Sequence, residues 1–261
     1  MQRREFVTAA CLLGLTPLVG TSKASSHLKS HKHAQYFELR LYRIKSKEKQ
    51  KKCSDFFRDV ALPAMNRIGI KPVGVFTHLE GDSHDMYMFI PYDSLEMVAT
   101  TPSKLLHDSA YVRDGADFLN VPKSDPAYER IESSLMVAFE GMPRVEVPNK
   151  KASRIFELRV YQSHSVKFGQ KKIEMFNAGG ELEIFRSTGL APVFFGESLV
   201  GAGLPNLTYM VVFDDMDSKD KNWNVFRDDP RWNKLKSDPQ YKGTVSHIDK
   251  TFLKPQDYSQ I

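Results

Sequence analysis

The sequence contains nearly the same hexapeptide twice. FELRLY occupies residues 37–42 and FELRVY occupies residues 156–161, a separation of 119 residues (156 − 37). Further matches keep a similar spacing, at residues 67–73 and 187–193, 87–88 and 209–210, and 125–128 and 238–241. A duplicated unit of about 100 residues is too long for a solenoid repeat. We therefore expect each copy to form a domain.

Within each copy, the hydrophobic period changes in the same order between that of a strand and that of a helix. The first copy predicts strands or helical regions at 36–44, 47–68, 70–79, 84–91, 94–120 and 131–140. The second copy predicts them at 154–163, 167–187, 190–200, 206–214, 217–236 and 245–253. This β-α-β-β-α-β order is the ferredoxin-like unit. The predicted fold class is α+β, with two tandem ferredoxin-like repeats.

The two predicted domains span residues 36–140 and 154–254. Residues 141–153, GMPRVEVPNKKAS, are rich in proline and lysine and are typical of a linker. Residues 255–261 are expected to form a tail. Pro63 should interrupt the first long helix, and Gly179-Gly180 should interrupt its counterpart in the second copy.

Several motifs in this order resemble the NIPSNAP family. They are F-E-L-R-x-Y opening a strand, G-[IL]-x-P-V, Y-M before a short acidic turn, and the Trp-rich stretch 223–232 with its D-P step. The resemblance covers both copies and implies a dimeric α+β barrel, in which two ferredoxin-like sheets face each other around a lumen. The first copy departs from the pattern at residues 101–107, so a site need not be duplicated. The halves could pair within one chain or between chains, and a homo-oligomer is one expectation.

The N-terminus is typical of an export signal. Arg3 and Arg4 precede Phe6 and a short apolar run, a pattern that resembles the twin-arginine type. The run is shorter than the roughly 20 residues that span a bilayer, so no membrane span is expected. We predict that residues 1–24 are removed near Ala24, that 25–35 form a flexible arm, and that the protein is periplasmic or otherwise exported from a bacterial cell.

The net charge argues against a nucleic-acid-binding protein, and the cysteine content argues against a reactive thiol. Removal of residues 1–24 takes away three positive side chains and one negative one, so the formal net charge falls from +5 to about +3. This charge is small and no basic stripe is interleaved with aromatics, so no nucleic-acid partner is expected. Cys53 is the one cysteine left, and its helical spacing from apolar residues predicts a buried, unreactive thiol.

Side chains of a strand alternate between its two faces. Phe37, Leu39 and Leu41 and their counterparts at 156, 158 and 160 should therefore share one face, which we expect to pack on the helices. The other face carries the polar triplets, which we expect to line the lumen as a ligand-binding floor: Glu38, Arg40 and Tyr42, and Glu157, Arg159 and Tyr161. Each Glu-Arg pair could instead only satisfy itself and fix the strand register.

Histidines are the other candidates for chemistry. His247 lies two residues from Asp249 on one predicted strand, and a neighbouring carboxylate tunes the basicity of a histidine. His107 lies on a predicted helix of the first copy. His107, His247 and Asp249 are therefore candidate catalytic residues, although no pair has the spacing of metal ligands, and no metal site is expected.

The preferred function is binding of a small amphipathic or aromatic molecule in the lumen. The alternative comes from the resemblance: dimeric α+β barrels include cofactor-independent monooxygenases and haem-handling proteins. A haem would require a histidine that points into the lumen, for which His107 and His247 are the candidates. No cofactor is predicted. The sequence contains no G-x-G-x-x-G, G-x-S-x-G or C-x-x-C motif, which disfavours nucleotide binding, serine hydrolysis and thiol redox chemistry.

Overall fold

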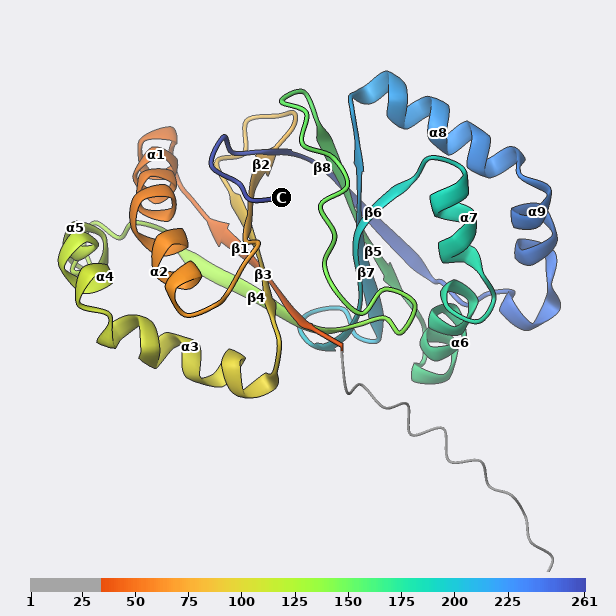
Figure 1. Cartoon of the computed structure of the whole chain (residues 1–261), viewed down its shortest axis with the longest axis horizontal. Coiled ribbons are helices and arrows are strands. Elements are labelled where there is room, and N and C mark those ends of the chain that lie inside the picture. Colours follow the sequence, from red (N-terminus) through yellow and green to blue (C-terminus); the bar gives the residue numbers. More distant parts are fainter. Residues whose placement is uncertain (1–33) are drawn as a thin grey trace, which may run out of the picture. The chain divides into compact units, whose positions relative to one another are not determined.

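The computed structural model describes residues 34–261 of the chain. The predicted export signal, 1–24, and most of the predicted arm, 25–35, lie outside these residues. Both copies have the β-α-β-β-α-β order that the sequence predicts, with each predicted helical region divided into shorter segments (Figure 1).

The first half comprises four strands and the helices that cover them. Its strands are β1 (Tyr36–Arg43), β2 (Gly74–His78), β3 (Met86–Tyr92) and β4 (Arg130–Ala138). Its helices are α1 (Lys47–Phe56), a π-helical turn η1 (Phe57–Ala61), α2 (Leu62–Arg67), α3 (Leu95–His107), α4 (Ser109–Asp114) and α5 (Ala116–Leu119).

The second half repeats this arrangement. Its strands are β5 (Ile155–Gln162), β6 (Ala191–Val200), β7 (Asn206–Phe213) and β8 (His247–Pro255). Its helices are α6 (Val166–Phe176), α7 (Glu181–Ser187), α8 (Met216–Asp228), α9 (Pro230–Ser237) and a short 3-10 turn, η2 (Pro239–Tyr241).

All eight strands form one closed barrel, in the order β1-β3-β2-β8-β5-β7-β6-β4. The two halves join at two antiparallel seams. At one seam β2 pairs with β8, and His78 lies opposite Leu253. At the other, β4 pairs with β6, and Val137 lies opposite Glu197. The two sheets therefore complete each other within one chain, which resolves the alternative that the sequence left open.

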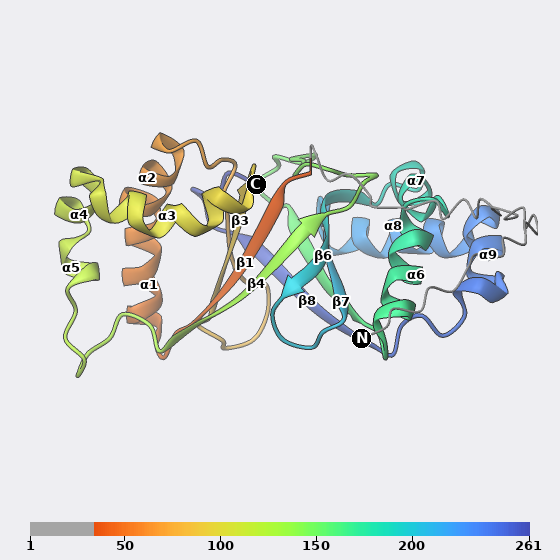
Figure 2. The same ribbon diagram turned by 90° about the horizontal axis from the view of Figure 1, so that it is seen from below.

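The helices of each half cover the outer face of their own four strands. Figures 1 and 2 show α1–α5 on one side of the barrel and α6–α9 on the other, with the strands between them. Each helical layer buries its own apolar cluster, one around Phe57 and Met88 and one around Phe185 and Tyr209. A third cluster contains residues of both halves and no helical residue, so it fills the inside of the barrel.

The strand faces are the reverse of the sequence-based prediction. Phe37 and Leu39 of β1, and Phe156 and Leu158 of β5, belong to the cluster inside the barrel rather than to the helical layers. Inside, aromatic rings pack edge-on and face-on; Phe76 contacts Phe156 with ring centroids 4.9 Å apart. Consequently Glu38, Arg40, Tyr42, Glu157, Arg159 and Tyr161 do not line a lumen but lie between the sheet and the helices.

This reversal has a simple physical cause. In a covered barrel a strand such as β7 is buried on both faces, one against the opposite sheet and one against helices. Alternation identifies the two faces but does not say which is inside. The inside is remote from solvent and offers few polar partners, so it takes the apolar triplets, whereas the helical layer supplies partners for buried charges.

Of the two predicted helix interruptions, the one at Gly179-Gly180 breaks the helix, whereas the one near Pro63 changes its hydrogen-bonding pattern without ending it. In the first half the π-helical turn η1 lies just before Pro63, and the chain stays helical from α1 to α2. In the second half residues 177–180 separate α6 from α7, and Gly180 has a positive φ of 83° that favours glycine.

Two segments predicted to be peripheral are packed instead. Gln35, placed in the flexible arm, is buried, and its side chain donates to Asp93 at 3.1 Å and accepts from the Val145 N–H at 3.0 Å. The predicted tail, 255–261, runs beside β2, where the N–H of Gln260 donates to the carbonyl of Val73 at 3.0 Å. Ile261 is buried in the cluster that fills the barrel.

Within residues 34–261, none of the helices has both the length and the apolar character needed to cross a bilayer.

Candidate functional site

The first polar cluster is centred on the carboxylate of Glu38. Arg40 donates to both of its oxygens, from Nε at 2.7 Å and from Nη2 at 2.9 Å. The hydroxyls of Tyr92 and Ser133 donate at 2.9 and 2.8 Å. Burial alone would raise the pKa of Glu38, but the hydrogen bonds and charge of Arg40, together with the two hydroxyls, lower it below its ordinary value. This carboxylate is therefore ionised and fully partnered.

The second cluster repeats this pair and extends it. Glu157 accepts from Arg159 Nε at 2.7 Å and from the indole N–H of Trp223 at 2.6 Å. The Arg159 guanidinium lies 3.9 Å from the Trp223 ring centroid, a cation–π contact. Its Nη1 donates to the Tyr161 hydroxyl at 3.2 Å, and the hydroxyl of Tyr209 donates to the same oxygen at 2.9 Å. Tyr161 is half-buried, whereas Tyr209 is fully buried.

A buried ion pair, which the sequence analysis missed, lies beside this cluster. Lys172 of α6 donates to Glu181 of α7 at 2.6 Å, and both side chains are almost fully buried. The Lys172 ammonium also lies 4.4 Å from the Phe176 ring centroid, 5.7 Å from that of Trp232 and 5.8 Å from that of Tyr161. Burial raises the pKa of Glu181 despite the charge of Lys172.

The two halves have diverged at these positions. The N-caps Ser46 and Ser165 differ by 119 residues, as do the two hexapeptides, so Cys53 is the counterpart of Lys172. The strand register corrects one sequence match, because Tyr209 lies opposite Arg159 whereas Met88 lies opposite Arg40. Tyr87, which the sequence match paired with Tyr209, faces the other side of its strand. Aligning the helix caps would have revealed a lysine at an apolar position.

The candidate histidines do not reach the barrel interior. His247 Nε2 lies 2.9 Å from Asp249 Oδ1, so the predicted pair forms, but both side chains are more than half exposed. Gln162 also donates to Asp249, at 3.0 Å. His107 is exposed on α3, with Nδ1 2.7 Å from the carbonyl oxygen of Ser103.

These positions do not fit a haem inside the barrel. An axial histidine must point at the iron from within the pocket. The ring of His107 bonds to its own helix on the outside, and the cluster inside the barrel is filled by packed aromatic side chains. Over the described part of the chain, no three or more His, Cys, Asp or Glu side chains are grouped so as to hold a metal ion.

A pocket of about 800 Å³ lies on the helical side of the first half. We call it the α5–β4 pocket, because α5, the following loop and the start of β4 line it: Phe118, Leu119, Val121, Lys123, Pro126, Ala127, Tyr128, Glu129 and Arg130. Its wall adjoins the first polar cluster, since the Tyr128 ring contacts Tyr42 with centroids 5.5 Å apart.

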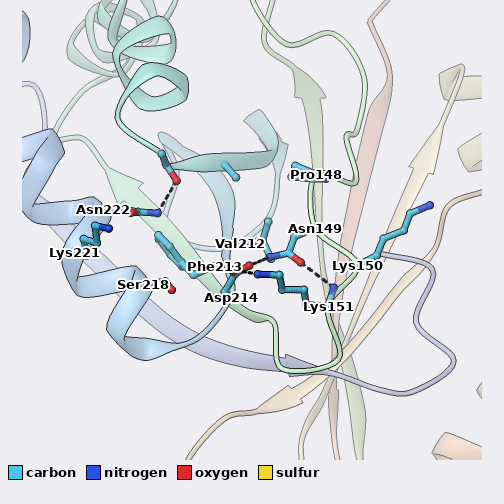
Figure 3. A pocket seen from close by; sticks show the side chains of 12 residues that line it. Pro148, Asn149, Lys150, Lys151, Val212, Phe213, Asp214, Ser218, Lys221 and Asn222 are labelled. Carbon is cyan, nitrogen blue, oxygen red and sulfur yellow. Dashed lines mark hydrogen bonds and ion pairs between the residues drawn. The ribbon is translucent and has the colours of Figure 1, made fainter.

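A second pocket, of about 710 Å³, lies in the second half, where the linker crosses the start of α8. We call it the linker pocket (Figure 3). Asn149 and Lys151 of the linker both contact the carboxylate of Asp214, and Asn222 of α8 donates to the carbonyl of Gly189 at 2.8 Å. These bonds hold the walls of the pocket together.

A closed barrel of two ferredoxin-like halves, each covered by its own helices, defines a protein of the dimeric α+β barrel type with both halves in one chain. The sequence model of the NIPSNAP family matches residues 37–140 and 156–260. The chain therefore belongs to the NIPSNAP family, as a form with two tandem copies.

Solved structures with the same fold are distant in sequence. A proposed monooxygenase from Lactobacillus acidophilus is 8% identical, with a TM-score of 0.58 over 85% of this chain and 94% of that one. A proposed monooxygenase from Fusobacterium nucleatum is 9% identical, with a TM-score of 0.55 over 85% and 93%. An anthrone oxidase-like protein is 13% identical, with a TM-score of 0.50 over 87% and 93%. Among curated proteins, none matches this sequence.

Proposed function

We propose that the protein binds a small amphipathic anion in the α5–β4 pocket of its first half. The observation that carries the proposal is a pocket of about 800 Å³ with a mainly apolar and aromatic lining and two cations at its side. Small-molecule sites are concave spaces of roughly 300–1,000 Å³ with apolar walls and a few polar groups. The proposed ligand site therefore lies on the helical side of the sheet. The sequence predicted it inside the barrel, where packed side chains occupy the space.

The pocket offers both parts of an amphipathic ligand a partner. Phe118 and Tyr128 present aromatic surface for an apolar body, with ring centroids 6.1 Å apart. Lys123 and Arg130 are exposed, and neither forms an ion pair with any residue from 34 to 261. Glu129 is the one acidic side chain in the lining. A carboxylate or sulfonate could therefore pair with the two cations.

In this proposal the polar triplet of the first half, Glu38, Arg40 and Tyr42, supports the wall of the pocket. Tyr42 separates the pocket residue Tyr128 from the Glu38–Arg40 pair. The pair itself is fully hydrogen-bonded and does not line the pocket. Its proposed contribution is to hold β1 and Tyr42 in place behind the pocket wall.

Dodecanoate binding to the chain without residues 1–24 tests the proposal. We expect saturable binding by titration calorimetry and a weakening of at least tenfold in the double variant Lys123→Gln, Arg130→Gln. The matched control is Lys234→Gln, Lys236→Gln, which removes two exposed lysines of α9 and should leave the affinity unchanged. Equal binding by all three proteins, or no binding, would exclude the pocket.

We propose oxidation of an aromatic substrate without a cofactor as a second candidate function, located in the second half. It is supported by structures of the same fold whose names describe a monooxygenase or an anthrone oxidase-like protein, and by the hydrogen bonding of Tyr161. The oxygen of Tyr161 accepts hydrogen bonds from Arg159 and Tyr209, and its own O–H has no acceptor among the residues of the described region. A phenol held in this way can donate its O–H to a bound substrate, and its phenolate form, which the same two donors would stabilise, can accept a proton from one.

Oxygen uptake with anthrone as substrate tests this second candidate. Activity that is lost in Tyr161→Phe and kept in Tyr42→Phe would support a site in the second half. Tyr42 is the matched control, because it occupies the same place in the first hexapeptide but is buried. Absence of uptake in the wild type, or equal loss in both variants, argues against it.

We also propose that the protein is exported by the twin-arginine route, on the basis of Arg3, Arg4 and the short apolar run. Cell fractionation of the full chain in a bacterial host tests this. Replacement of both arginines by lysine keeps the charge and should retain the protein in the cytoplasm. Export of the lysine variant at the wild-type level would contradict the proposal.

A further inference from the structure

We propose that the linker pocket is a second ligand site and that it takes a small dicarboxylate with an apolar middle. This inference does not depend on the proposed function, because the two pockets lie in different halves and share no residue. It follows from the charged side chains around the pocket and from the apolar residues in its lining.

Three lysines line the pocket, and one of them is neutralised. Lys151 forms an ion pair with Asp214, whose second oxygen accepts from Asn149 at 2.7 Å. Asp215, next in the chain, caps α8 and accepts from the Ser218 N–H at 2.8 Å. Hydrogen bonds from Lys151 and then Asn149 lower the pKa of Asp214, so its charge is already balanced by the protein.

The other two lysines remain available. Lys150 and Lys221 are exposed, and no carboxylate within residues 34–261 pairs with either. They belong to different walls, since Lys150 lies on the linker and Lys221 on α8. In Figure 3 they occupy opposite ends of the pocket, with Val212 and Phe213 between them. Lys150 extends away from the pocket centre, and rotation of its flexible stem would bring its ammonium to the rim.

This arrangement selects for a molecule with two anionic ends. A single anion could pair with one lysine and would leave the other unpartnered. A dicarboxylate with an aromatic or aliphatic middle could reach both and cover the apolar surface of Ala191 and Pro148. With a volume of about 710 Å³, the pocket has the size of a small-molecule site.

Such a ligand would also bridge the linker and the second half. The linker already contacts Asp214, which directly follows β7, through Asn149 and Lys151, and a ligand between Lys150 and Lys221 would add a second connection, to α8. Binding should therefore protect the linker, whose residues 150–153 are exposed, from proteolysis.

Terephthalate and benzoate are the probes, because they share an aromatic ring and differ by one carboxylate. With the chain that lacks residues 1–24, we expect terephthalate to bind at least fivefold more tightly than benzoate. Lys150→Gln and Lys221→Gln should each reduce this preference to about one. The α9 control Lys234→Gln, Lys236→Gln and the α5–β4 variant Lys123→Gln, Arg130→Gln should both keep it.

Limited trypsin digestion gives a second readout that does not require the lysine variants. Saturating terephthalate should slow cleavage after Lys150 and Lys151 at least threefold, and benzoate should slow it less. The inference is overturned if terephthalate shows no saturable binding, if its preference over benzoate survives in both lysine variants, or if it disappears in the Lys123→Gln, Arg130→Gln variant instead.

Discussion

Phe194 of the second half stacks on Phe89 of the first, with ring centroids 4.4 Å apart and planes inclined by 24°. Phe37 packs against both rings, at 5.1 Å from Phe89 and 5.5 Å from Phe194. All three side chains are almost completely buried. This contact joins the two sheets inside the barrel, and it occupies the space where a lumen ligand was expected.

Phe194→Ala should therefore lower the free energy of unfolding by about 3–5 kcal/mol, because it removes a large buried ring and leaves a cavity. Urea denaturation measures this change. Leu199→Ala is the control on the same strand, since Leu199 is 43% exposed, and it should change stability by no more than about 0.5 kcal/mol. Similar effects of the two substitutions would mean that the barrel interior is not packed.

The two Glu-Arg pairs should differ in their contribution to stability. Arg159 and Glu157 have side chains that are 12% and 2% exposed, compared with 20% and 11% for Arg40 and Glu38. Removing one partner of a buried pair costs roughly 3–5 kcal/mol, which we expect for Arg159→Ala. Arg40→Ala should cost less, because water reaches Glu38 more easily.

A lysine substitution at Arg40 tests the geometry of its pair with Glu38. Arg40→Lys keeps the charge but loses the planar group that bonds both oxygens of Glu38. We expect it to recover only part of the stability lost in Arg40→Ala, measured by thermal unfolding. Full recovery would show that charge alone, and not the two-bond geometry, stabilises the pair.

The buried Lys172–Glu181 pair should be replaceable by apolar residues if it is only structural. Lys172→Met alone leaves the Glu181 carboxylate buried without a partner and should cost several kcal/mol, of the order of 3–5. The double variant Lys172→Met, Glu181→Leu should regain most of that stability. A double variant as unstable as the single one would show that the pair is held by interactions that apolar packing does not replace.

Alkaline pH should destabilise the protein through Tyr42. Burial raises the pKa of Tyr42 to about 12, from an ordinary value of 10.0. A group whose pKa is higher in the folded state favours folding below its unfolded pKa and loses that contribution as pH rises through the folded value. We therefore expect stability to fall between pH 10 and 12, and to fall less in Tyr42→Phe. Equal slopes for the two proteins would contradict this.

Cys53 should be unreactive until the protein unfolds. The thiol is fully buried and donates to the carbonyl of Ala127 at 3.4 Å, and burial raises its pKa to about 12. The thiolate is the reactive form, so 5,5′-dithiobis(2-nitrobenzoate) at pH 8 should label the folded chain without residues 1–24 very slowly. Addition of urea should release one thiol per chain. Rapid labelling of the folded protein would place Cys53 nearer the surface.

Much of the fold could be predicted from the sequence. The repeated hexapeptide marks the first strand of each sheet, and the change of hydrophobic period located every strand and helical region to within a few residues. The predicted domain boundaries were least accurate where contacts with residues distant in sequence hold a terminal segment in place. Gln35 and Ile261 look peripheral in a linear sequence, yet Gln35 bonds to Val145 and Ile261 to Arg154, far away along the chain.

The candidate site was predicted only in part. Pairing of Glu with Arg within each triplet was the alternative to the predicted ligand-binding floor, and the structure shows both pairs. Trp223 and Tyr209 could not be assigned to Glu157 and Tyr161, because they come from other elements. The two pockets were not predicted, since their walls are built from segments that only the tertiary structure brings together.

The sequence by itself determined the duplication, the order of elements and the separation of each strand into an apolar and a polar face. Only the tertiary structure decided which face is inside. In a closed barrel covered by helices, Phe37 and Glu38 are both buried, so burial does not distinguish them. What distinguishes them is the supply of hydrogen-bond partners. Glu38 reaches Tyr92, Ser133 and Arg40 on the outer face, whereas Phe37 packs inside the barrel against apolar rings such as those of Phe89 and Phe194.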